Sequence, residues 1–580
     1  MELRNRLARA LSRTLLVALV ALGALVASPG PAAAKPELER PPSLTSPPPG
    51  YELTGREVVR IAGLGEEVRA ERPAHRRFAP TAYTRGPGRW QVSYFDSRSR
   101  EVAQVRVDDD SGAILEQWTG DQVAWTMARG YEGAFGRKLN SPWVWIPLCV
   151  LFLAPFVDPR RPLRPLHLDL LVLLAFGVSH IFFNRGQIDT SVPLAYPVLI
   201  YLLGRLLWVG FRPRERRTQG GTRDRLLPLV PATWLLVALV ALVGFRVGMN
   251  VIDSNVIDVG YAGVIGADRI ADGDPLYGPG FSDDVERGDT YGPLAYLAYI
   301  PFEQVLPWGG SWDELPAAHA AAIAFDLITL LGLVLLGRRL RPGLEGYELG
   351  IALGYAWVTY PYALFALQTN SNDGLVAMCT VLALLALTLA PARRGLSAGL
   401  GGAAVGLGTV AKFAPLALAP LFAAGLGGEG RAPRTRERAV FALALVLVVA
   451  AAVLPFVPDG GLRELYDRTV GYQAGRPSPF SIWGQSDSLG WLQTAAKAGA
   501  LGLSVLVAFV PRRRGPLQAA ALGAAVIIAL QLAVTHWFYL YVSWFAPLAL
   551  VALLGPYRGP AAAGDRSPQQ PIAERKPVPA

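Results

Sequence analysis

Nine acidic side chains lie in one stretch of the chain, residues 248–290, which directly follows a long apolar run. Two of them, Asp253 and Asp258, come within about two helical turns of that run. A carboxylate at the edge of an apolar environment loses part of its hydration, which raises its pKa and makes it a better general base. The carboxylates from Asp268 onward are typical of an acidic, solvated loop. The sequence therefore offers Asp258 and Asp253 as candidate proton acceptors.

Lys412 also occupies an unusual place, because it separates two apolar segments, 397–411 and 413–427. A lysine between such segments is unfavourable unless its amine reaches the lipid headgroups or pairs with an anion. Two interpretations remain open, namely snorkelling to the headgroups and binding of a phosphate group carried by a substrate.

Arg476 and His536 are further candidates for substrate contacts. Arg476 lies with Tyr472 and Trp483 in the segment 458–490. An arginine among aromatic rings suits a phosphate and the face of a sugar ring, but it also suits an ordinary loop at the membrane surface. His536 follows an apolar run and precedes two tyrosines, which are typical of an aromatic belt. It is the weaker candidate for a phosphate or acceptor contact.

Motifs for several other kinds of chemistry are absent from the sequence. It has no G-x-x-x-x-G-K-[ST], H-E-x-x-H or CxxC motif. Cys149 and Cys379 lie in apolar runs and cannot form a disulfide framework. The Gly-rich segment 399–408 is typical of close helix packing in a membrane rather than of a nucleotide loop. No cofactor is expected and no metal is required, although the acidic cluster 283–289 could hold a cation weakly.

The composition indicates a membrane protein. Of 580 residues, 52% are hydrophobic and only 17% are charged, against about 25% charged residues in soluble domains. Runs long enough to approach a membrane span of about 20 residues predict an all-α polytopic protein with about thirteen spans. They lie at 142–157, 166–184, 192–211, 227–247, 317–337, 347–366, 375–391, 397–411, 413–427, 439–457, 491–510, 517–535 and 538–555. Asp326, inside one of them, is expected to pair with a polar group on another span.

The distribution of arginine predicts which loops share a side of the membrane. Arginines gather in alternate loops, at 158–165, 212–225, 338–341, 393–394, 431–438, 512–514 and 558. These loops should be cytoplasmic, which places the acidic loop 248–290 outside. Because the basic residues lie in these loops, the net charge of +10 does not indicate nucleic-acid binding. The apolar segment 291–307 should be re-entrant or interfacial, because a crossing there would reverse every later loop.

The N-terminal part reads as an exported domain. Residues 1–34 have a basic start, an apolar run and a small-residue cleavage site, which predict a secretory signal, with an uncleaved anchor as the alternative. Residues 35–50 read as a Pro-rich linker and 51–140 as a small α+β domain. A helix is predicted at 54–72, and strands at 90–95, 102–107 and 114–118. Asp108–Asp110 should form a solvated turn rather than a calcium loop.

The helix and the run VRVDDDSGAILEQW of residues 51–140 resemble the PepSY-type domain found outside bacterial membranes. This resemblance implies an interaction or regulatory module, with an envelope protein as a possible partner. It supplies no catalytic residue.

The acidic loop itself resembles the first outer loop of C-type glycosyltransferases. The resemblance rests on Asp258-Val259-Gly260-Tyr261, on Gly273-Asp274-Pro275-Leu276-Tyr277, and on Tyr291-Gly292-Pro293-Leu294. In those polytopic enzymes an aspartate of this loop is the catalytic base. Asp258 is the closer match and Asp253 the alternate.

A second set of residues resembles bacterial glycosyltransferase family 87. Gln368-Thr369-Asn370-Ser371-Asn372 is followed by a span, a Gly/Ala-rich helix and Lys412-Phe413-Ala414-Pro415. The family expects a glycine where Leu367 stands. The similarity covers 227–555 as a GT-C-like domain. It leaves 142–211 as an added three-helix module and 559–580 as a disordered cytoplasmic tail.

The resemblance implies a plasma-membrane enzyme that transfers a sugar, of mannose or arabinose type, from a polyprenyl-phosphate donor. The acceptor would be an extracytoplasmic glycan or lipid, and the anomeric centre would be inverted. Its substrate-binding residues would be Lys412, Arg476, Asn372, His536 and Tyr291. The alternative is a non-catalytic membrane sensor or assembly protein on a degenerate transferase scaffold. A transporter is a third reading, but its usual sign, buried charged residues along several spans, is weak here because such residues are few and scattered.

Overall fold

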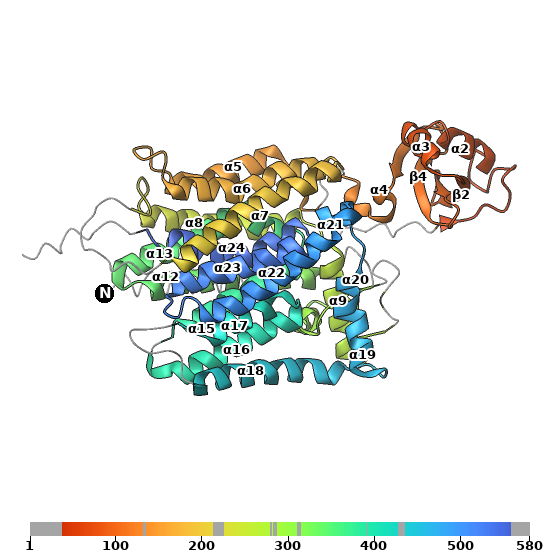
Figure 1. The fold of residues 1–580 in the computed structure, drawn as a ribbon. Helices are drawn as coiled ribbons and strands as arrows, with labels where there is room; N and C mark the ends of the chain where they lie inside the picture. The colour runs from red at the N-terminus through yellow and green to blue at the C-terminus, as the bar shows by residue number, and fades with distance from the viewer. Residues whose placement is uncertain are drawn as a thin grey trace, which may run out of the picture.

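The computed structural model describes residues 38–130, 135–212, 225–278, 281, 287–309, 315–389, 391–426 and 435–557. A small outer domain lies beside one end of a large helical bundle, to which it is joined near α4 (Asp121–Ala124) (Figure 1). The predicted signal, 1–34, and the predicted tail, 559–580, lie outside the described residues.

The outer domain is a five-stranded antiparallel meander that is covered by two short helices. Its strands pair in sequence order and are β1 (Leu38–Glu39), β2 (Ala79–Arg85), β3 (Arg89–Phe95), β4 (Glu101–Asp108) and β5 (Ile114–Thr119). The predicted helix is divided into α2 (Gly55–Ala62) and α3 (Glu66–Glu71). The sequence missed β2, which carries few apolar residues and a proline, and β1, which lies inside the predicted linker.

The turn Asp108–Asp110 is more structural than expected, because Asp109 is buried. Its carboxylate accepts hydrogen bonds from Glu52 N at 2.6 Å, Leu53 N at 3.0 Å and Trp90 Nε1 at 2.7 Å. The expectation of a fully solvated turn was therefore wrong for Asp109. The turn ties the chain that precedes α2 to the sheet.

The membrane region consists of helices that run along a common direction (Figure 1). The longer helices are α5 (Pro142–Leu153), α6 (Pro165–Asn184), α7 (Ile188–Phe211), α8 (Ala232–Ile252), α12 (Pro316–Leu340), α13 (Gly343–Thr359), α15 (Asp373–Leu387), α16 (Arg394–Ala411), α18 (Thr435–Val453), α22 (Gly490–Phe509), α23 (Pro516–Ala533) and α24 (Val542–Leu554). Shorter helices include α9 (Asp258–Asp272), α10 (Leu294–Leu297), α11 (Ile300–Glu303), α14 (Pro361–Gln368), α17 (Ala419–Ala423), α19 (Gly461–Tyr466), α20 (Tyr472–Gly475) and α21 (Ile482–Gln485).

Helical segments stand at all thirteen predicted places, but not all of them have the length of a span. Among the described residues, seven helices are long and apolar enough to cross a membrane, or eight if the pair α13 and α14, bent by 57°, is counted as one span. The segment 291–307 forms only the one-turn helices α10 and α11. It is therefore not a span, in agreement with the expectation that it does not cross.

Asp326 pairs across the bundle as expected. Its Oδ1 accepts hydrogen bonds from Arg246 Nη2 at 2.6 Å and from Trp357 Nε1 at 2.9 Å. Arg246 also donates to the carbonyl of Val358 at 2.9 Å. The carboxylate therefore joins α8, α12 and α13.

The arginine-bearing helix ends meet at one end of the bundle. Arg164 Nη2 donates to the carbonyl of Arg225 at 2.8 Å, and its guanidinium lies 4.0 Å from the ring centroid of Tyr557. Arg341 Nη2 donates to the carbonyl of Gly555 at 2.5 Å. The loops that follow the opposite helix ends carry the candidate site.

Candidate functional site

Asp258 is the first residue of α9, and the preceding strand-like segment fixes its position. The N–H of Asn255 donates to the carbonyl of Gln368, and the N–H of Ile257 donates to the carbonyl of Thr369, both at 3.1 Å. A Cβ atom at Gly260 would lie only 2.2 Å from the carbonyl oxygen of Asn370. Glycine at this position lets the first turn of α9 approach the 368–370 segment closely.

The side chain of Asn370 completes this attachment. Asn370 has a left-handed backbone, with φ of 49°, a conformation that asparagine tolerates better than most residues. Its Nδ2 donates to Ser254 Oγ at 2.9 Å and to the carbonyl of Asn255 at 3.0 Å, while its Oδ1 accepts from Asn250 Nδ2 at 2.8 Å. The two motifs singled out in the sequence thus form one unit that presents Asp258.

The surroundings of Asp258 suit a carboxylate that exchanges a proton. The side chain is exposed, yet the protein around it displaces bulk water, and this desolvation raises the pKa of Asp258. A hydrogen bond from Val259 N and the positive charges of Arg476 and Lys412 lower the same pKa without cancelling the rise. A raised pKa makes the ionised carboxylate a stronger base.

Lys412 follows the last residue of α16 and is buried. Its Nζ donates to Asp373 Oδ1 at 2.8 Å, and this same oxygen accepts from Trp544 Nε1 at 2.8 Å. The amine lies 5.3 Å from the ring centroid of Tyr291 and 5.8 Å from that of Tyr541. The snorkelling interpretation of Lys412 was wrong, because the amine is paired inside the protein rather than directed to headgroups.

Tyr291 reaches Lys412 because its loop packs closely against α16. A Cβ atom at Gly292 would lie 2.2 Å from the carbonyl oxygen of Val410, so a side chain there would push the loop away. Tyr277 Oη donates to the carbonyl of Tyr291 at 2.8 Å and secures the loop from the other side.

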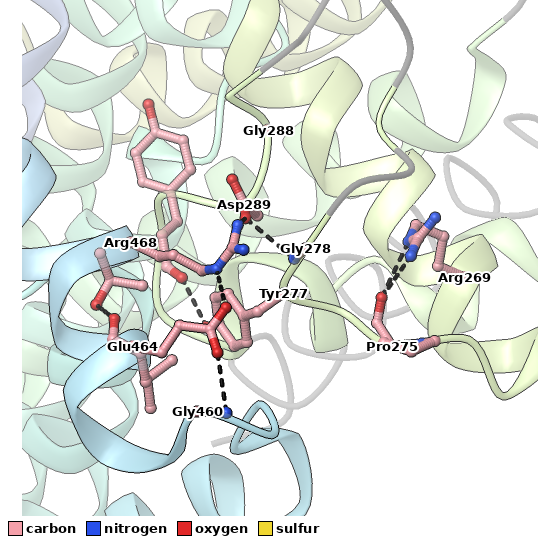
Figure 2. A network of polar contacts seen from close by, with 12 residues as sticks. Arg269, Pro275, Tyr277, Gly278, Gly288, Asp289, Gly460, Glu464 and Arg468 are labelled. Atoms are coloured by element: carbon pink, nitrogen blue, oxygen red, sulfur yellow. Dashed lines mark hydrogen bonds and ion pairs between the residues drawn. The ribbon is translucent and has the colours of Figure 1, made fainter.

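A network around Arg468 anchors the same loop to α19 (Figure 2). The Arg468 guanidinium binds Glu464 Oε1 and Asp289 Oδ2, each at 2.7 Å, and Asp289 Oδ2 also accepts from Gly278 N at 3.1 Å. A cavity of about 490 Å³ lies beside it, lined by Arg287, Gly460, Arg463, Glu464, Asp467 and Arg468. No predicted site residue lines this cavity, so the network supports the site without forming it.

Arg476 and His536 approach the cluster together. The guanidinium of Arg476 lies 5.3 Å from the ring centroid of Trp125, and the ring of His536 lies 5.7 Å from the same tryptophan. His536 Nδ1 is 2.8 Å from Ser478 Oγ. Burial, followed by the charges of Arg476 and Lys412, lowers the pKa of His536 well below its usual value, which keeps the imidazole neutral.

Asp253 and Asn372 are placed differently. Asp253 ends α8 and contacts Lys138, whose backbone N–H and Nζ lie 3.2 Å and 3.7 Å from its carboxylate oxygens. Lys138 lies in the segment that links the outer domain to α5. Asn372 is buried at the start of α15, and neither polar atom of its side chain has a hydrogen-bond partner among the described residues. The structure thus brings Asp258, Tyr291, Lys412, Arg476 and His536 together, but not Asp253.

Sequence reasoning missed several members of this cluster. Asp373 follows Asn372 directly and begins an apolar helix, which is the same signal that identified Asp258. Trp544 and Tyr541 gave no signal, since aromatic residues at a helix end are common in membrane proteins. Trp125 lies in a segment that was attributed to the outer domain.

The cluster combines an exposed carboxylate, two cations and a wall of aromatic rings. A carboxylate can accept a proton from a hydroxyl group, cations can stabilise a departing phosphate, and aromatic faces suit sugar rings. Among the described residues, no group of three or more His, Cys, Asp or Glu side chains could hold a metal ion.

Comparison with known proteins finds a similarity in part of the membrane region. Residues 290–557 match the family model of Glycosyltransferase family 87. No curated protein and no solved structure matches the chain. The matched region contains Tyr291, Asn372, Lys412, Arg476 and His536, whereas Asp258 and the outer domain precede it. Over residues 290–557 the chain is therefore similar to glycosyltransferase family 87, and its helices are those of a GT-C-like, multi-pass membrane protein.

Proposed function

We propose that the protein transfers a sugar from a polyprenyl-phosphate donor to a glycan or lipid acceptor outside the plasma membrane. The donor sugar would be a hexose or pentose of mannose or arabinose type. The observation that carries this proposal is the convergence of Asp258, Lys412, Arg476, Tyr291 and His536 at one end of the bundle. These residues come from segments that are far apart in the sequence.

The proposed reaction is a single displacement. An acceptor hydroxyl oxygen attacks C1 of the sugar and forms the new glycosidic bond, while the bond from C1 to the phosphate oxygen breaks. Asp258 takes the hydroxyl proton, and the polyprenyl phosphate leaves with the bonding electron pair. Attack opposite the leaving group inverts the anomeric centre.

The two cations have different tasks in this proposal. Arg476 is partly exposed and forms no ion pair among the described residues, so its guanidinium is available for the donor phosphate. Lys412 is already paired with Asp373. Its positive charge therefore acts on the phosphate from a distance, and its contacts with the rings of Tyr291, Tyr541 and Trp544 hold the aromatic wall in place. Arg476 is the first phosphate contact and Lys412 supports it.

The orientation follows from the charge distribution. The described helix ends that carry arginines lie at the opposite end of the bundle from Asp258 and would be cytoplasmic. The site would then face outside, where a lipid-linked donor arrives laterally through the membrane. A donor that stays in the bilayer matches a site built at the ends of membrane helices.

The test is a transfer assay with the purified full chain in lipid vesicles. Radiolabelled polyprenyl-phosphate mannose and arabinose are supplied together with a glycan or lipid acceptor extract, and labelled product is measured. The proposal expects label in the acceptor and release of polyprenyl phosphate. If the unmodified protein transfers label from no polyprenyl-phosphate sugar, the non-catalytic sensor or assembly function takes its place.

A further inference from the structure

A connector from the outer domain, residues 121–130, passes next to the candidate site. Trp125 lies in it, between α4 and the turn Thr126–Ala128. Its ring contacts Phe480 at a centroid distance of 5.5 Å, His536 at 5.7 Å and the Arg476 guanidinium at 5.3 Å. Trp125 therefore touches two candidate site residues, although it precedes the region that matches the family model.

The connector is held from both sides. Arg129 is buried, and its Nη2 donates to Gln104 Oε1 of β4 at 2.5 Å, while its Nε donates to the carbonyl of Gln122 at 2.8 Å. Gln122 Nε2 in turn donates to the carbonyl of Gly186, between α6 and α7, at 3.1 Å. The position of Trp125 is thus set by the outer domain and by the membrane region together.

The guanidinium of Arg476 lies over the ring of this tryptophan. In the part of the chain that the structure describes, its Nε is buried without a hydrogen-bond partner, and no carboxylate pairs with it. A guanidinium over an indole ring is favoured electrostatically, and the flat ring restricts the rotamers of the arginine. Trp125 is the aromatic platform beneath the guanidinium.

We propose that Trp125 is a positioning residue, which holds the Arg476 guanidinium where the phosphate of a polyprenyl-phosphate donor binds. This inference rests on the proposed function. It means that the connector of the outer domain is part of the donor site rather than only a tether. The phosphate is charged before and during the reaction, so the loss of Trp125 should raise KM more than it lowers kcat.

The test measures binding of polyprenyl monophosphate to the full chain in lipid nanodiscs. Trp125→Ala and Trp125→Leu should each bind about tenfold more weakly than the unmodified protein, since a partly desolvated cation–π contact is worth roughly that much. Trp125→Phe keeps a ring and should recover most of the affinity. Trp143→Ala is the matched control, because Trp143 is 89% exposed on α5. In transfer assays, the Leu variant should show a raised KM with a nearly unchanged kcat.

Three results separate the possible failures. If the unmodified protein binds and transfers but Trp125→Leu binds the lipid phosphate equally tightly, the role of Trp125 is wrong while the proposed function stands. A Phe variant as weak as the Leu variant would also overturn it, because the ring would then not matter. If the unmodified protein binds no polyprenyl phosphate, the proposed function and this inference fall together. If Trp125→Ala does not fold, the test is made with Trp125→Leu.

Discussion

Two buried carboxylates in the bundle have the same kinds of partners but lie in different surroundings. The first, Asp326, accepts hydrogen bonds at one oxygen from Arg246 and from the indole of Trp357. Its partners come from α8 and α13, within the body of the bundle. Its contacts join three helices, although Arg246 Nε stays buried without a hydrogen-bond partner in the part of the chain that the structure describes.

The second carboxylate, Asp373, accepts at one oxygen from Lys412 and from the indole of Trp544. Its Oδ2, however, is buried without a hydrogen-bond partner among the described residues. Its charge also raises the pKa of Asp258, next to the positive charges of Arg476 and Lys412. This ion pair is one member of a larger set of charges.

The comparison teaches that the geometry of an ion pair does not reveal its role. A buried ion pair is weak evidence for stability, because desolvation of both charges offsets much of their attraction. The neighbouring groups separate the two cases. The Arg246–Asp326 pair joins helices within the bundle. The Lys412–Asp373 pair lies near the exposed carboxylate of Asp258 and the cation of Arg476, and we therefore assign it to the candidate site.

The largest effect is expected from breaking the pair in the bundle. Arg246→Met leaves Asp326 buried without its cation, which should lower the free energy of unfolding by about 3–5 kcal/mol. Arg246→Met combined with Asp326→Leu removes both charges and should recover most of that loss. Unfolding of the purified protein in detergent measures both values, and the folded fraction of each variant should keep its transfer rate. A folded double variant without transfer would assign this pair to the site.

The pair at the site should respond differently to the same treatment. Lys412→Met combined with Asp373→Leu should recover stability in the same way, because no unpaired charge is left. Its kcat/KM for transfer should nevertheless fall about 10²-fold, the usual cost of losing one electrostatic contact in a site. If the double variant transfers sugar at the normal rate, Lys412 and Asp373 are structural, and the distinction between the two pairs disappears.

A smaller effect concerns pH. Burial raises the pKa of Asp258, and the base acts only when ionised. The fall of kcat/KM on the acidic side should therefore have its midpoint above the usual aspartate value of about 3.9. A midpoint at or below that value would contradict the assignment.

The same raised pKa predicts the sign of a stability change. Folding raises the pKa, so the unfolded chain loses its proton first as pH rises, and the ionised carboxylate reduces stability above the folded pKa. At neutral pH, Asp258→Asn should accordingly melt at a slightly higher temperature than the unmodified protein.

The sequence predicted much of this architecture for physical reasons. Apolar runs have to be helices in a membrane, so all thirteen segments appear as helices. The exclusion of 291–307 from the spans came from the positions of the arginines, and the structure agrees. Strand β2 was missed because its apolar residues do not alternate clearly. The bend between α13 and α14 was not predicted, because such a break changes the amino-acid composition of a span very little.

The candidate site was only half visible in the sequence. Asp258 and Lys412 stood out because charge at a membrane boundary is costly, and Arg476 stood out because aromatic residues lie near it in the sequence. Asp373 carries the same signal but was overlooked beside Asn372. The contact of Trp125 with Arg476 joins residues about 350 positions apart, and such long-range pairs cannot be read from spacing. Asp258 was the closer match to the resembled loop and Asp253 the alternate, and the fold puts only Asp258 near Lys412 and Arg476.

Sugar transfer by the matched variants Asp258→Asn and Asp253→Asn tests the assignment of the base. Both changes remove one carboxylate from the same loop and keep its size and shape. We expect Asp258→Asn to bind polyprenyl phosphate normally and to lose about 10²–10⁴-fold in kcat, as befits a missing general base. Asp253→Asn, which loses only its contact with Lys138, should transfer at close to the normal rate. Normal transfer by Asp258→Asn would contradict the proposed mechanism.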